Sequence, residues 1–201
     1  MELFFDVETT GLPSRGASYR NLSAYEGCRI VSIAWILRTS EKIFSQRYCI
    51  INQSPEIPDS VPLGASFIHG ISRKMTNDFG KDLKSVLQDF LIDVSRSKTI
   101  VCHNAQFDKG VVASEMFRLG WDSGMIEMFL NDDTHCTMLS NVDLVNAKFL
   151  NSNRKKWPKL EELHRYCFHK DFESAHNSLM DTEATARCYY FVKNNVIDLT
   201  D

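Results

Sequence analysis

The sequence predicts an α/β fold in which a mixed β-sheet carries helices on both faces. Two observations favour this fold class. The apolar segments nearest the amino terminus are strand-like, and two of them lie close enough together to form an antiparallel hairpin. Beyond them, short apolar runs alternate with segments of helical spacing. Strands that come first as a hairpin and then alternate with helices are typical of a mixed sheet between helical layers.

Five strands are expected along the chain. The first spans residues 2–8, and the second, residues 30–38, contains an apolar run that suits a buried strand. Only four residues separate the second strand from the third, at 43–51, so these two should form the hairpin. Two shorter strands are expected at 99–103 and 134–138.

Helices are expected where apolar residues recur every three or four positions, as they do in residues 82–95 and 106–119. Further helices are expected from near Asp59 or Ser60 to Gly70, and at about 138–146, 159–168 and 178–194. No repeat, low-complexity segment or linker interrupts this order. Residues 1–201 are therefore expected to form a single domain.

The composition predicts a soluble, intracellular protein. No apolar run is long enough to cross a bilayer, and the amino terminus does not have the pattern of a secretory signal. Six cysteines are dispersed without a Cys-x-x-Cys pair, which indicates reduced thiols. The net charge of −3 argues weakly against a nucleic-acid partner, but bound metal would neutralise part of the negative charge.

A zinc site is an alternative role for His164, Cys167 and His169, which lie close in sequence. His135 and Cys136 could complete such a site. The spacing of these residues matches no standard set of zinc ligands, so a zinc site is the less favoured interpretation.

Two carboxylates, Asp6 and Glu8, lie at the end of the first strand. Residues two apart in a strand point to the same face, so these side chains project together. Burial of two charges is costly unless they share a cation, and a metal ion is the usual remedy. The alternative is that both simply lie at an exposed strand end, and from these two residues alone the alternative is favoured.

Two further segments place acidic residues at helix starts. In VCHNAQFDKG (residues 101–110), Asp108 falls in the first turn of a helix that follows a strand, where an acidic residue is also ordinary. In AHNSLMDTEATARCYYFV (residues 175–192), Asn177 or Ser178 would cap a helix that carries Asp181. His176 must precede this helix to meet Asp181, because five positions on a continuous helix place two residues on different faces.

Together these three segments resemble, in order and in residue type, the three motifs of the DEDDh exonuclease family. The residues that carry the resemblance are Phe5 to Gly11, then His103, Asn104, Phe107 and Asp108, and then His176 and Asp181. Weaker similarities are FIHGIS (67–72), CTMLS (136–140) and WPKLEELHRYCF (157–168), so the resemblance spans nearly the whole chain. Each motif alone is weak evidence, whereas the three in this order are strong.

The resemblance implies a ribonuclease H-like fold and 3′→5′ hydrolysis that releases nucleoside 5′-monophosphates. It implies that two Mg²⁺ ions, with Mn²⁺ as a substitute, are held by Asp6, Glu8, Asp108 and Asp181. His176 would then be the general base that takes a proton from the attacking water. The alternative for His176 is an ordinary surface histidine at a helix start.

Substrate contacts follow from the same resemblance. The backbone of Thr9, Thr10 and Gly11 would approach the terminal nucleotide, with Gly11 leaving room for it, and Leu12 would wedge against the terminal base or simply occupy a turn. His69 and Phe107 are candidates for sugar or base contact, with core packing as the alternative for Phe107. Asn104 would cap the following helix, contact substrate, or both.

The expected partner is the 3′ end of a single-stranded nucleic acid, with DNA favoured and RNA possible; no membrane is involved, and no polymerase partner is identified. The alternative functions are an exoribonuclease and a catalytically inert binding module. The segment 13–29 is longer than in many family members and would form a lid, contact the nucleic-acid strand, or simply decorate the surface. The basic run 154–159 would follow phosphates or form a solvated loop, and Ser178 stands where the family often has Ala.

Overall fold

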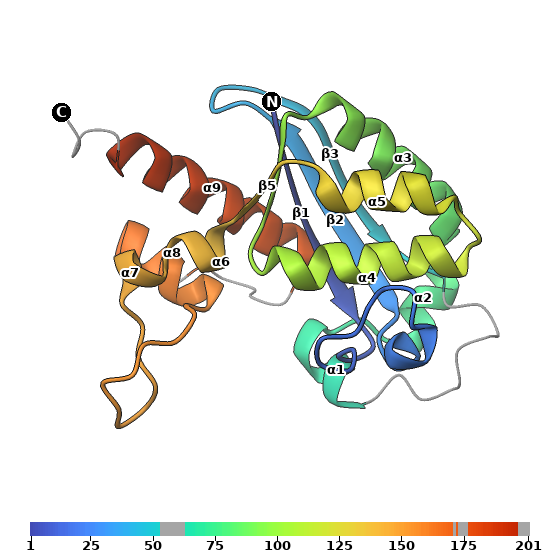
Figure 1. Ribbon diagram of the computed structural model, residues 1–201, viewed down its shortest axis with the longest axis horizontal. Helices are drawn as coiled ribbons and strands as arrows, with labels where there is room; N and C mark the ends of the chain where they lie inside the picture. The colour runs from blue at the N-terminus through green and yellow to red at the C-terminus, as the bar shows by residue number, and fades with distance from the viewer. Residues whose placement is uncertain (53–62, 171, 173–176, 197–201) are drawn as a thin grey trace.

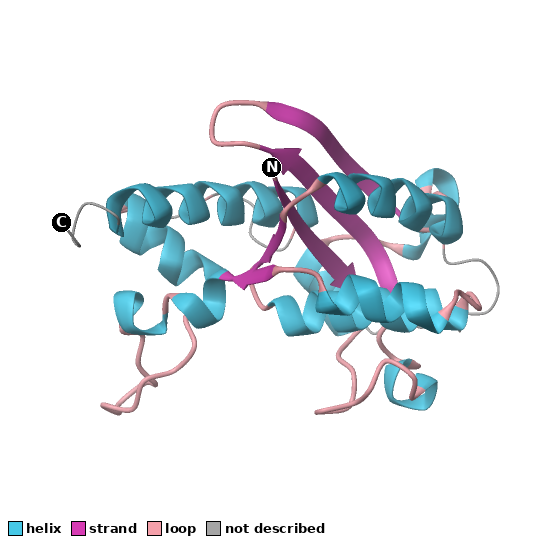
Figure 2. Ribbon diagram, turned by 45° about the horizontal axis from the view of Figure 1, so that its top comes forward, coloured by secondary structure: helices cyan, strands magenta, loops and turns pink. Residues whose placement is uncertain are grey.

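The computed structural model describes residues 1–52, 63–170, 172 and 177–196. A five-stranded sheet runs through its centre in the order β3-β2-β1-β4-β5. The strands are β1 (Glu2–Thr9), β2 (Ile30–Arg38), β3 (Ile43–Ile50), β4 (Thr99–Cys102) and β5 (Thr134–Cys136). β1, β2 and β3 are antiparallel, whereas β4 runs parallel to β1 and β5 parallel to β4. The predicted fold class, a mixed sheet with one hairpin, is confirmed, and Figure 2 shows that hairpin at the top.

One face of the sheet is covered by α3 (Leu83–Arg96), α4 (Ala105–Arg118) and α5 (Ser123–Asn131), which lie in front of the strands in Figure 1. Alternate residues of β1 point to this face, and Phe5 packs edge-on against Phe90 of α3. Trp35 joins the same cluster and donates its indole N–H to Asp93 at 2.9 Å, so its polar atom is satisfied in the core. This cluster is the main hydrophobic core.

The other face of the sheet is covered by α9 (Ser178–Val196), which lies behind the strands in Figure 1. Phe4, Val101 and Ala186 pack between this helix and the sheet. Next to α9 lies α8 (Leu160–Phe168), and the two helices meet through Leu163, Cys167 and Cys188. All six cysteines lie in the described part of the chain and carry free thiols, as their spacing indicated.

Short elements connect these layers: η1 (Leu22–Tyr25), α1 (Leu63–His69), α2 (Arg73–Phe79), α6 (Thr137–Ser140) and α7 (Val142–Val145). The prediction of a single helix at 138–146 is therefore wrong, because the non-helical backbone of Asn141 separates α6 from α7. β5 ends two residues earlier than expected because Thr137 already begins α6.

Two helices, α2 and α5, were not expected from the sequence. α2 contains few apolar residues and begins where the Ser72 side chain accepts from the Met75 N–H, while Asp122 caps α5 in the same way. The expected start of the helix before Gly70 falls on residues 59–60, outside the described residues. Among the described helices, none is long and apolar enough to span a membrane.

Candidate active site

Asp6 and Glu8 project from β1 toward α9, on the face opposite Val7. Across the sheet, Asp6 is paired with Ala34 and Glu8 with Ser32, and a β-bulge follows directly after Glu8. From α9, Asp181 approaches the same point. Carboxylate oxygens of Asp6, Glu8 and Asp181 all lie within 4.8 Å of one another. Three of the four predicted metal ligands are thus brought together by two elements far apart in sequence.

The start of α9 is fixed against β2, which places Asp181. The hydroxyls of Ser178 and Ser32 are hydrogen-bonded at 3.0 Å, and both residues are fully buried. Oδ1 of Asn177 accepts from the backbone N–H of Leu179 at 3.1 Å, so Asn177 caps the helix as predicted. The serine found where the family often has alanine therefore makes a buried hydrogen bond that an alanine would lack.

Asp108 completes the acidic set from the first turn of α4. Its side chain is only 2% exposed, and its Oδ1 accepts from the backbone N–H of Val7 at 3.4 Å. Its Oδ2 is buried without a hydrogen-bond donor in the described part of the chain. An orphaned carboxylate oxygen beside other carboxylates fits a cation ligand, because an unpaired buried charge is otherwise costly.

The electrostatics of these four acids agree with a cation site. Burial, followed by the charges of Asp108, Asp181 and Glu8, raises the pKa of Asp6 well above its usual value. Burial also raises the pKa of Asp108, and burial together with Asp181 raises the pKa of Glu8 to about 7. Four mutually repelling oxygen ligands are a donor set that suits Mg²⁺ or Mn²⁺.

His176 lies outside the described residues, so its role stays a prediction. A neighbour that sequence reasoning missed is Tyr48 of β3, which is paired with Ala34 in the same cross-strand row as Asp6. Burial, and to a lesser extent the Glu8 carboxylate, raise the pKa of Tyr48. The hairpin register could have revealed it, because residues that are directly opposite on neighbouring strands share a face.

The turn after β1 is tied to the end of the 13–29 segment. The Thr10 N–H donates to the Arg29 carbonyl at 2.9 Å, and the Thr10 hydroxyl donates to the Gly27 carbonyl at 2.9 Å. A Cβ on Gly11 would lie 2.7 Å from that same Gly27 oxygen. A side chain at position 11 would therefore collide with the backbone of residue 27, whether or not a nucleotide is bound, and the role of Gly11 toward substrate stays a prediction. The Thr10 N–H is already paired with the Arg29 carbonyl and is not available to substrate. The Thr9 hydroxyl likewise donates within the turn, to the Gly11 carbonyl at 2.7 Å.

Three other predicted substrate residues line one groove. Leu12 is 81% exposed there, Asn104 lies at its edge, and Phe107 both lines it and packs against the main core. Asn104 occupies the N-cap position of α4 with a left-handed backbone, φ of 85°, but its side chain makes no capping hydrogen bond, and its contact with substrate stays a prediction. His69 does not line this groove: it is buried, and its Nδ1 accepts from the Ile71 N–H at 3.1 Å.

The zinc interpretation finds no support among the described residues, where the carboxylates are the only group with metal-ligand spacing. His164 instead has its Nδ1 3.0 Å from the Lys170 carbonyl, and Cys167 packs against Cys188. In the basic run, Lys155 and Lys156 are ion-paired with Asp143 and Glu162, respectively. These two lysines are therefore partly neutralised, which weakens the idea that the run follows phosphates.

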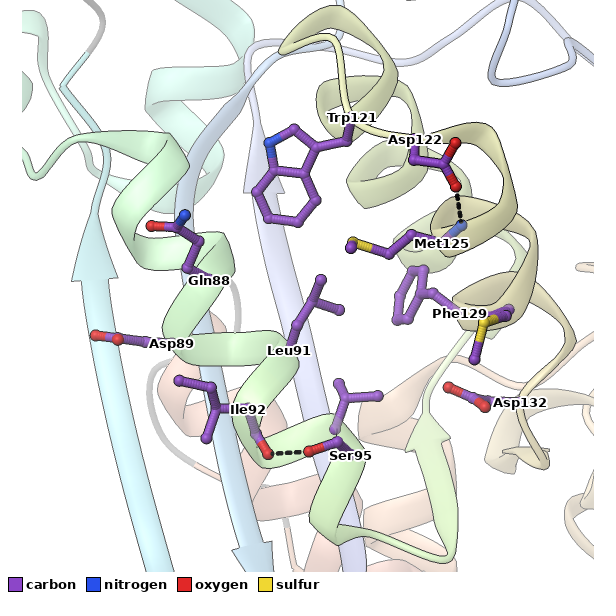
Figure 3. A pocket seen from close by; sticks show the side chains of 12 residues that line it. Gln88, Asp89, Leu91, Ile92, Ser95, Trp121, Asp122, Met125, Phe129 and Asp132 are labelled. Atoms are coloured by element: carbon purple, nitrogen blue, oxygen red, sulfur yellow. Dashed lines mark hydrogen bonds between the residues drawn. The ribbon is translucent and has the colours of Figure 1, made fainter.

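A second hollow, of about 920 Å³, lies between α3 and α5 on the other face of the sheet (Figure 3). Trp121, Met125 and Phe129 give it a largely apolar lining. Its charged lining residues are Asp89, Asp122 and Asp132. An apolar hollow with an acidic rim, separated from the carboxylate cluster by the sheet, does not have the chemistry of a phosphodiester site.

A family model described as an exonuclease matches residues 3–189. The chain belongs to the exonuclease family. This confirms the assignment to the DEDDh 3′→5′ exonucleases that the three motifs indicated, and with it the enzyme class.

Relatives of known identity agree with the family. The DNA polymerase III epsilon subunit of Salmonella typhimurium is 22% identical, over 99% of this chain and 74% of the relative. The epsilon subunit of Escherichia coli K12 is 23% identical, over 94% of this chain and 69% of the relative. A crystal structure of E. coli exonuclease I with a dA16 oligonucleotide superposes with a TM-score of 0.70 at 18% identity. That match covers 96% of this chain but only 40% of exonuclease I, and it shows the fold alone.

Proposed function

We propose that the chain removes nucleotides one at a time from the 3′ end of single-stranded DNA and releases nucleoside 5′-monophosphates. The observation that carries this proposal is the approach of Asp6, Glu8 and Asp181 to within 4.8 Å beside the buried Asp108. Such a cluster on its own would be destabilising. It becomes favourable if divalent cations occupy it during function.

In this proposal Asp6, Glu8, Asp108 and Asp181 hold two Mg²⁺ ions, with Mn²⁺ as a substitute. The bound ions supply Lewis-acid stabilisation of the charge that develops on the scissile phosphate. Asp108 is pre-positioned by the Val7 N–H, and Asp181 by the capped and hydrogen-bonded start of α9. These contacts fix the carboxylates before substrate arrives, which reduces the cost of assembling the site.

His176 is the proposed general base. It precedes α9 by two positions and Asp181 by five. An imidazole can take the proton of an attacking water at neutral pH because its ordinary pKa lies near 6.5. We expect His176→Ala to lower kcat without abolishing the binding of Mn²⁺, whereas loss of Mn²⁺ binding would make His176 a ligand.

The preference for DNA rests on the relatives, which are named as subunits of a DNA polymerase and as an exonuclease bound to an oligodeoxynucleotide. An exoribonuclease is the alternative. The experiment that separates them compares 5′-labelled single-stranded DNA, duplex DNA with a recessed or mismatched 3′ end, and RNA of the same sequence. Faster shortening of single-stranded DNA supports the proposal; faster shortening of RNA would replace it, and inertness toward all three would favour a binding module.

A further inference from the structure

The groove beside the first turns of α4 is lined partly by residues outside the three catalytic motifs. It measures about 830 Å³ and lies between residues 12–19, the start of α4, and Trp157. Its described lining residues include the exposed Arg15 and the buried Lys109, whose Nζ donates to the Thr134 hydroxyl, and no aspartate or glutamate. The hollow between α3 and α5 has the opposite character, with three aspartates (Figure 3). In a chain of net charge −3, a groove lined without acids favours an anionic ligand.

One wall of the groove is held rigidly. The Thr10–Gly27–Arg29 hydrogen bonds close the segment at its base, and the Tyr19 hydroxyl donates to Glu127 of α5 at 2.7 Å. The Tyr19 ring also packs edge-on against Phe117 of α4. Residues 13–29 are therefore anchored at both ends of the loop, and the groove is preformed.

The opposite wall is Trp157, and a hydrogen bond from the partly buried His103 holds the backbone beside it. Nε2 of His103 lies 3.1 Å from the carbonyl oxygen of Pro158, the residue that directly follows Trp157. A carbonyl can only accept, so Nε2–H is the donor. Nδ1 is 3.0 Å from the Thr137 hydroxyl, which donates to it, and this is consistent with a neutral ring because burial lowers the pKa of His103 to about 4.

Trp157 is held in place but not covered. Its side chain is 64% exposed, although an indole is among the most favourable side chains to bury. Facing the same groove are the exposed Leu12 and the partly buried Phe107, with Arg15 exposed at its side. An exposed aromatic side chain and a cation that line the same groove, together with Phe107 from the helix that also carries Asp108, match how proteins bind unpaired bases and their phosphates.

We propose that this groove binds an unpaired base of the substrate strand, on the 5′ side of the scissile bond, stacked on Trp157 with Arg15 beside the backbone phosphate. This inference rests on the proposed function and names an upstream subsite for it. Stacking on Trp157 needs a single strand at that position, so the groove also favours unpaired over paired 3′ ends.

The test combines a change in the protein with a change in the substrate. Oligothymidylates that lack one base at the second, third or fourth position from the 3′ end are compared with the intact strand. One abasic position should raise the wild-type KM about 5- to 150-fold. Trp157→Ala should raise KM on the intact strand by a similar factor and leave kcat nearly unchanged. In this variant, removing the base at that position should no longer raise KM further.

Trp157→Phe should retain most of the affinity, because a phenyl ring still stacks. Phe149→Ala is the matched control: Phe149 is a half-exposed aromatic residue that packs under Arg154 outside the groove, and its loss should change nothing. An unchanged KM for Trp157→Ala, or full sensitivity to every abasic position in that variant, would overturn the inference.

Binding measurements separate this inference from the proposed function. In an Asp181→Asn background, anisotropy of a labelled oligothymidylate reports binding without hydrolysis. If the wild-type protein digests nothing, the exonuclease proposal fails. The groove inference then stands if Trp157→Ala weakens binding in that background, and it falls if affinity is unchanged or if the parent does not bind.

Discussion

The backbone N–H of Val7 donates to Oδ1 of Asp108 across 101 positions of sequence, at 3.4 Å. This contact ties the strand that carries Asp6 and Glu8 to the helix that carries Asp108. It occupies one oxygen of the carboxylate, while Oδ2 has no donor among the described residues. One oxygen thus holds the side chain in place, and the other is left for a cation.

Replacing Asp108 with asparagine should separate these two roles. In Asp108→Asn the amide oxygen can still accept from Val7, but the charge that would bind a cation is gone. We expect activity to fall by at least about 100-fold. Loss of a direct metal ligand should cost no less activity than loss of a residue that only orients a metal ligand. Oligonucleotide hydrolysis and circular dichroism check this, and an active Asp108→Asn protein would exclude Asp108 from the site.

Divalent cations should stabilise the protein against heat. At a Mg²⁺ concentration of 100 times Kd, binding to the folded state adds about 2.7 kcal/mol, or a Tm increase of about 5–11 °C for a chain of this size. Calorimetry with Mg²⁺ and with EDTA measures the shift. Asp6→Asn should reduce it strongly, whereas an equal shift in that variant would place the cation elsewhere.

Without metal, stability should fall as the pH rises from about 4.5 to 7. The pKa of Glu8 is raised to about 7 in the folded protein, so the folded state binds more protons than the unfolded state in that range. The buried Asp6 and Asp108 act in the same direction. Urea unfolding in EDTA at several pH values should show this decline, and Glu8→Gln should make it shallower. A free energy of unfolding that rises between pH 4.5 and 7 would contradict the raised pKa values of these buried carboxylates.

The anchoring of residues 13–29 depends on a buried ion pair. Glu115 of α4 is 1% exposed and accepts from Nε of Arg29 at 2.7 Å and from the Ile30 N–H at 3.3 Å. Glu115→Ala leaves Arg29 without this partner and should cost about 3 kcal/mol in the free energy of unfolding. Asp143→Ala, which removes the exposed partner of Lys155 outside this segment, should cost far less, because exposed ion pairs contribute little to stability. Urea denaturation compares the two, and equal losses would mean that the buried pair does not anchor the segment.

The parts of this fold that follow from sequence are those with local causes. β1, β2 and β3 are visible as apolar runs with short connections, and α3 as a regular apolar stripe. Asp6 and Glu8 share a face because of strand geometry alone. The approach of Asp6 and Glu8 to Asp108 and Asp181 was expected only through the resemblance, since those contacts join residues 100 or more positions apart.

Other features depend on tertiary contacts that no local pattern encodes. Asn104 takes a left-handed backbone at the start of α4 and makes no side-chain capping hydrogen bond, and the carbonyl of Gly27 leaves no room for a side chain at Gly11. α5 is short and was missed because its packing residues, Ile126 and Phe129, make too brief a pattern. The hydrogen bond from His103 to Pro158 joins residues 55 positions apart and places Trp157 at the groove.

The central claim is that the four carboxylates form the metal site of a 3′→5′ exonuclease. The most direct measurement digests one single-stranded oligodeoxynucleotide, labelled at its 5′ end, with the wild-type protein and with Asp181→Asn, in Mg²⁺ and in EDTA. We predict a ladder that shortens one nucleotide at a time only for the wild-type protein with Mg²⁺. The same ladder from Asp181→Asn, or from the wild-type protein in EDTA, would contradict the claim.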